Sequence, residues 1–67
     1  MAAWTVSDLS AWLASRDLNG PAGHLRQQGV SGEDFLSMTV DVLVREVGLS
    51  PFTAKKLAGL REAYLAE

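Results

Sequence analysis

The 67-residue sequence contains no cysteine, one histidine and two prolines. Without cysteine the chain can form neither a disulfide nor a zinc–thiolate site, and His24 alone cannot supply the ligand set of a metal ion. We therefore expect His24 to be structural or solvated and the protein to bind no metal or cofactor. A small core of packed side chains must stabilise the fold.

Long apolar runs are also missing. No segment approaches the ~20 apolar residues that cross a membrane, and the start MAAWTVSDLS lacks a basic stretch followed by an apolar one. The sequence contains no phosphate-binding loop or dinucleotide fingerprint, and several of its hydroxyl residues stand where helix caps are expected. These absences predict a soluble intracellular protein, cytoplasmic or nuclear, that is not an enzyme.

Basic residues are few, and they are unevenly placed. Six lysines and arginines face eight acids, which gives a net charge of −2 and makes nucleic-acid binding unfavourable. Residues 31–46 hold four acids and one arginine (net −3), whereas residues 51–61 hold three bases and no acid (net +3). The charge is therefore separated along the chain.

Helix signals dominate what is present. Thr5 and Asp8 form a capping-box pattern before a helix over residues 6–16, with Trp4 placed to pack on Leu9. Pro21 suits the first position of a short second helix that Gly29 closes. Ser31 with Asp34, Thr39, and Ser50 mark three further helix starts, and Gly48 marks a helix end. The last helix begins at Pro51 and aligns four residues on one face: Thr53, Leu57, Leu60 and Tyr64.

No strand pattern, repeat or linker competes with these signals. The sequence thus predicts a single all-α domain over residues 1–67, a five-helix globule with a longer C-terminal helix.

The chain resembles the sterile alpha motif (SAM) domain family over nearly its full length. The first half of the resemblance rests on Trp4, Thr5, Asp8, Trp12, Leu13, Val30, Gly32, Phe35 and Leu36. The second half rests on Met38, Thr39, Leu43, Val47, Gly48, Leu49, Lys55, Lys56 and Leu57. The sequence departs from the family pattern at Pro21, Leu25 and Val42, and Phe52 replaces the usual glycine that opens the last helix.

The resemblance implies a protein-interaction module that pairs head to tail with itself or with another SAM domain. Its end-helix surface would comprise Phe52, Thr53, Lys55, Lys56 and Arg61. Its mid-loop surface would comprise Glu33, Asp34, Asp41 and Glu46. Repeated contacts between two different surfaces build an open polymer, so a homo-oligomer or helical polymer is expected.

Two alternatives stay open at this point. A minority of the family resembles RNA-hairpin readers, and the basic residues of the last helix could contact a few phosphates of RNA or DNA. The chain could also be a monomeric domain that packs against a different protein, with Lys55 and Lys56 simply facing water.

Overall fold

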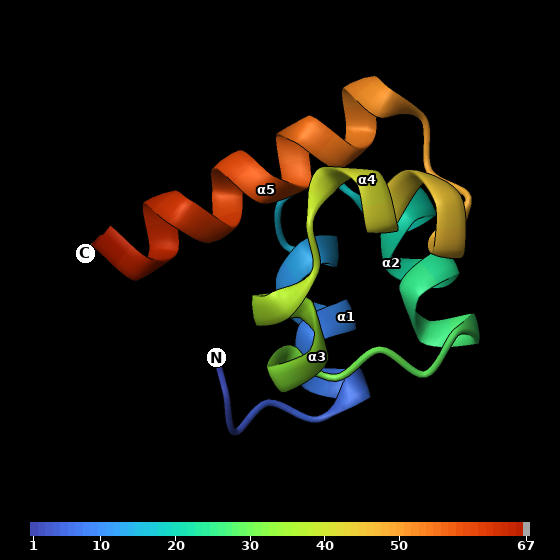
Figure 1. Cartoon of the computed structure of the whole chain (residues 1–67). Coiled ribbons are helices and arrows are strands. Elements are labelled where there is room, and N and C mark those ends of the chain that lie inside the picture. The colour runs from blue at the N-terminus through green and yellow to red at the C-terminus, as the bar shows by residue number, and fades with distance from the viewer. Residues whose placement is uncertain (67) are drawn as a thin grey trace. The chain divides into compact units, whose positions relative to one another are not determined.

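The structure is a computed structural model that describes residues 1–66. Helices form all of the regular structure in these residues, and no strand occurs among them. The chain divides into two compact units, Met1–Ser37 and a second that begins at Met38. Figure 1 shows the helices in chain order. The predicted all-α class is confirmed.

The first unit opens with helix α1, Val6–Ala14, and its cap is the predicted one. The Asp8 N–H donates to Thr5 Oγ1 over 3.2 Å, and the Thr5 N–H donates to Asp8 Oδ2 over 3.0 Å. These reciprocal bonds satisfy two donors that a helix start leaves unpaired. The helix ends two residues before the predicted Arg16, because the chain turns at Asp17 in the left-handed conformation (φ 62°).

Helix α2 spans Asn19–Gln27, so the prediction that it starts at Pro21 was wrong. Pro21 is the third residue of the helix, and Leu18 precedes the helix without a side-chain cap. A proline fits there because the first four N–H groups of a helix have no intrahelical acceptor, so its missing donor costs nothing. Gly29 follows with a positive φ of 69°, as expected for a residue that ends a helix.

Helix α3, Gly32–Ser37, completes the first unit. The Ser31–Asp34 pair caps it as predicted: the Asp34 N–H donates to Ser31 Oγ, and the Ser31 N–H donates to Asp34 Oδ2. The entry to α3 is tied to the N-terminal segment, since the Gly32 N–H donates to the Trp4 carbonyl over 3.0 Å. The buried apolar side chains of the unit are Leu9, Leu13, Leu18, Ala22, Leu25, Val30 and Phe35.

The second unit starts with a short helical segment. Helix α4, Val40–Val42, continues directly into the π-helix η1, Leu43–Val47, so the two together correspond to the predicted fourth helix. Thr39 caps the start, with its hydroxyl accepting from the Val42 N–H. Gly48 ends the segment with a positive φ of 86°, as predicted.

Helix α5, Pro51–Ala66, is the longest helix of the described chain, at 16 residues. Ser50 caps it as predicted, because the Thr53 N–H donates to Ser50 Oγ over 3.2 Å. Its buried residues are Ala54 and Leu57, while the other predicted members of the apolar stripe are half-buried. Together with Leu43, Val47 and Leu49, these two residues form the buried apolar set of the second unit.

Candidate protein-interaction surface

The start of α5 presents an aromatic side chain and two lysines on one exposed face. Phe52 is 79% exposed, the highest value among the large apolar side chains described. Lys55 and Lys56 follow at i+3 and i+4, which places all three on the same side of the helix. Both lysines are exposed, and neither side chain makes a hydrogen bond or ion pair with another residue of the described chain.

Thr53, a second predicted member of the end-helix surface, serves the helix cap. It is half-buried, and its Oγ1 accepts a 2.9 Å hydrogen bond from Ser50 Oγ. Together with the bond from the Thr53 N–H to Ser50 Oγ, it caps the first turn of α5. Thr53 therefore positions Phe52 and the lysines rather than extending their exposed face.

Arg61 lies on a different side of α5. It follows Phe52 by nine residues, which at 3.6 residues per turn places it about half a turn away around the axis. Its guanidinium Nη1 donates to the Met38 carbonyl over 2.6 Å, and the residue is half-buried. This bond anchors α5 to the residue before the Thr39 cap, so Arg61 has a structural partner within the second unit.

Two of the four predicted mid-loop acids have partners of their own. The Asp34 carboxylate accepts from the N–H and the hydroxyl of Ser31, so it belongs to the α3 cap. Asp41 Oδ1 lies 3.2 Å from Arg45 Nε, in an exposed ion pair at i, i+4. Such an exposed ion pair contributes little to stability, so Asp41 could exchange Arg45 for an intermolecular partner at small cost, whereas Asp34 would have to give up the α3 cap.

The other two acids, Glu33 and Glu46, are exposed and unpaired within the described residues. Glu33 lies in the first turn of α3, in the first unit, and Glu46 lies in η1, in the second. The structure thus places the end-helix residues on one helix and the mid-loop residues on three short elements.

Sequence reasoning missed an aromatic cluster in the first unit. The rings of Trp4 and Trp12 lie 5.5 Å apart with an angle of 56° between their planes, and the Arg16 guanidinium carbon lies 5.5 Å from the Trp12 centroid. The helical spacing of Trp12 and Arg16 signals that contact, but Trp4 precedes α1 and its position depends on the fold. His24, which was expected to be structural or solvated, is exposed and places Nδ1 2.9 Å from the Gly20 carbonyl within α2.

These features define a small all-α module in which exposed lysines lie on one helix and exposed acids on other helical elements. The family model of the SAM domain (sterile alpha motif) matches residues 2–60, and the chain belongs to this family. SAM domains are in general non-catalytic protein-interaction modules. Comparison with curated proteins and with solved structures gave no match. Within residues 1–66, no helix is long and apolar enough to span a membrane.

Proposed function

We propose that residues 1–67 act as one SAM domain that associates head to tail with a second SAM domain, either a copy of itself or that of another protein. In this contact the end-helix surface of one molecule meets the mid-loop surface of the next. The observation that carries the proposal is the exposure of Phe52 beside two unpaired lysines. An exposed aromatic with a basic rim has the composition of a protein interface centre.

Charge and burial have separate roles in this contact. Lys55 and Lys56 would steer the encounter and set its register against carboxylates such as Glu33 and Glu46. Affinity would come mainly from the area that Phe52 buries, because exposed ion pairs contribute only ~0.2–1 kcal/mol each. Since the two surfaces differ, the contact does not close on itself, and repetition would give an open polymer.

Sedimentation velocity over a wide concentration range, at low and high salt, tests the proposal. We expect species that grow without a fixed endpoint and become smaller as salt screens the charged surfaces. The Lys55→Glu/Lys56→Glu variant should associate at least about tenfold more weakly, because attraction is replaced by repulsion at two positions. Phe52→Ala should also weaken association while leaving the thermal midpoint unchanged, since the ring is exposed.

A mixing experiment distinguishes head-to-tail association from other geometries. A chain with Phe52→Ala, Lys55→Gln and Lys56→Gln retains its mid-loop surface, and a Glu33→Lys/Glu46→Lys chain retains its end-helix surface. The neutral glutamines offer the introduced lysines no opposite charge, so only one pair of surfaces can associate. Each variant alone should be monomeric, whereas the equimolar mixture should form a heterodimer of fixed size through the one intact pair of surfaces. A mixture that stays monomeric, or a lysine variant that polymerises like the original chain, would show that the surfaces are assigned incorrectly.

A further inference from the structure

The first unit contains a groove of about 330 Å³ between helices α1 and α2. On the α1 side its lining residues are Ser7, Ser10, Ala11 and Ala14, which repeat at i, i+3, i+4 and i+7. They therefore form one stripe along the helix, and each of them is small. Across the groove, Ser10 Oγ donates a long hydrogen bond of 3.5 Å to the Ala22 carbonyl.

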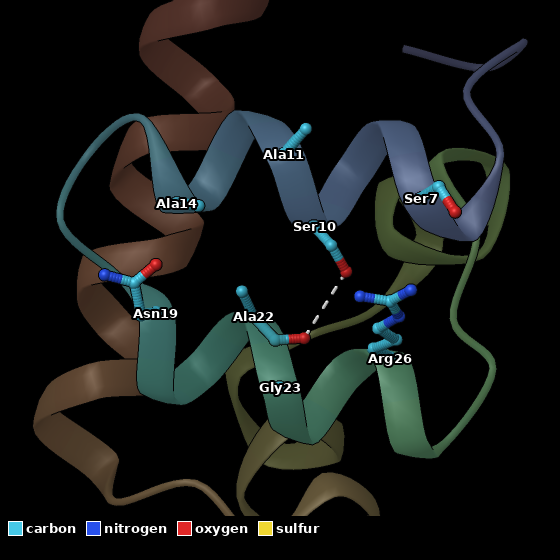
Figure 2. Close-up of a pocket in the computed structure, with 8 residues that line it drawn as sticks. All are labelled: Ser7, Ser10, Ala11, Ala14, Asn19, Ala22, Gly23 and Arg26. Carbon is cyan, nitrogen blue, oxygen red and sulfur yellow. Dashed lines mark hydrogen bonds between the residues drawn. The ribbon is translucent and has the colours of Figure 1, made fainter.

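Helix α2 lines the groove with the same spacing. Its residues are Asn19, Ala22, Gly23 and Arg26. Figure 2 shows the two helices side by side and antiparallel, with Arg26 near the Ser7 end of α1. Because three of these four side chains are small, the backbone of a third helix could approach the groove closely.

Arg26 gives the groove its electrostatic character. Its side chain reaches from α2 toward α1 (Figure 2), and it makes no hydrogen bond or ion pair with any residue from 1 to 66. Among residues 1–66, those that line the groove include no acid. The groove thus contains one positive charge without an acidic partner, and most of its other lining side chains are small. It is complementary to a helix that carries a carboxylate among small residues.

The C-terminal half of α5 has this pattern on its exposed side. Gly59, Glu62, Ala63 and Ala66 repeat at i, i+3, i+4 and i+7, and all four are exposed. The Glu62 side chain makes no hydrogen bond or ion pair with another described residue. The stripe and the groove also match in length, because each spans seven residue steps or ~10 Å of helix.

We propose that the groove between α1 and α2 receives the C-terminal half of α5 from a second copy of this chain, with Glu62 of that copy paired with Arg26. This contact is additional to the head-to-tail contact and uses neither Phe52 nor the lysines. Its two surfaces differ, so like the head-to-tail contact it is heterologous.

The contact is short and is expected to be weak. An interface along ~10 Å of helix falls below the ~1,000 Å² of total area typical of stable complexes. Concentration-dependent chemical shifts in two-dimensional ¹H–¹⁵N spectra detect such weak association. The measurement uses the 67-residue chain carrying Lys55→Glu/Lys56→Glu, so that head-to-tail association does not obscure the result.

In this background we expect backbone amides of residues 7–14, 19–26 and 59–66 to shift together as concentration rises. Arg26→Glu or Glu62→Arg should weaken this association about three- to tenfold, since each replaces an exposed ion pair by a like-charge contact. The double variant Arg26→Glu/Glu62→Arg should restore it. Arg16→Glu, which makes the same charge change as Arg26→Glu at an exposed residue outside the groove, should have no effect.

A steric variant provides an independent check that does not rely on charge. Ala11→Met places a long side chain in the groove at an exposed helix position. Methionine has a helix propensity only slightly below that of alanine, so the variant should block the contact without unfolding the chain. The proposal is overturned if no amides shift, if the shifting amides lie elsewhere, or if the shifts survive both charge reversals. If the groove instead binds an acidic helix of a different protein, no amides will shift with the concentration of this chain.

Discussion

Replacing Gly32 with alanine should destabilise the protein because the site has no room for a methyl group. A Cβ at this position would lie 2.7 Å from the Cβ of Trp4 and closer still to the carbonyl oxygen of Met1. Both neighbours belong to the N-terminal segment, which also accepts the Gly32 N–H on the Trp4 carbonyl over 3.0 Å. The segment and the start of α3 cannot both keep their positions once the methyl group is present.

The magnitude follows from the two ways in which the structure could adjust. If the N-terminal segment keeps its place, the added methyl group overpacks the site, which typically lowers the free energy of unfolding by ~1–3 kcal/mol. Releasing it loses the Gly32 hydrogen bond, ~0.5–1.5 kcal/mol, and weakens the ring contact between Trp4 and Trp12, worth a similar amount. The gain in helix propensity, at most ~1 kcal/mol, offsets part of either cost. A net loss of ~1–2 kcal/mol in the free energy of unfolding is expected from these terms.

Urea unfolding followed by tryptophan fluorescence measures this loss. With a slope near ~1 kcal/mol per molar urea, the midpoint should fall by about 1–2 M. Gly23→Ala and Gly59→Ala are matched controls, because a Cβ at either position meets no atom within 4 Å, and each should stabilise by ~0.5–1 kcal/mol. A Gly32→Ala variant that unfolds at the same urea concentration as the original chain, or at a higher one, would refute the steric reasoning.

Three further predictions concern the caps and the surface charges. Gly48→Ala should lower the free energy of unfolding by ~1–2 kcal/mol, because its φ of 86° is unfavourable for a side chain; an unchanged urea midpoint would contradict this. Thr5→Ala should cost ~1 kcal/mol by removing the side-chain acceptor of the α1 cap, as judged by thermal unfolding, and a cost near zero would show that water caps the helix equally well. Asp41→Asn should change stability by less than ~0.5 kcal/mol, since its pair with Arg45 is exposed; a larger loss would mean that the pair supports α4.

The helix starts could be predicted from the sequence because the interactions that make them are local. Thr5 with Asp8, and Ser31 with Asp34, are three residues apart, and their reciprocal hydrogen bonds depend only on the first turn of each helix. The helix end at Gly48 could be predicted for the same reason, since a positive φ depends on the type of one residue. The sequence also identified the exposed group at the start of α5, since Lys55 and Lys56 lie one helical turn after Phe52.

The tertiary structure decided the features that join residues distant in the chain. It gave Arg61 a partner 23 positions away, the Met38 carbonyl, whereas the resemblance to SAM domains implied that Arg61 belongs to the end-helix surface. It also made Gly32 a contact site for Met1 and Trp4, and it formed the groove by placing two stripes of small residues opposite each other. Helical periodicity reveals which residues share a face, but the partner of that face depends on how the chain turns. The turn at Asp17, which the sequence did not indicate, brings α2 beside α1.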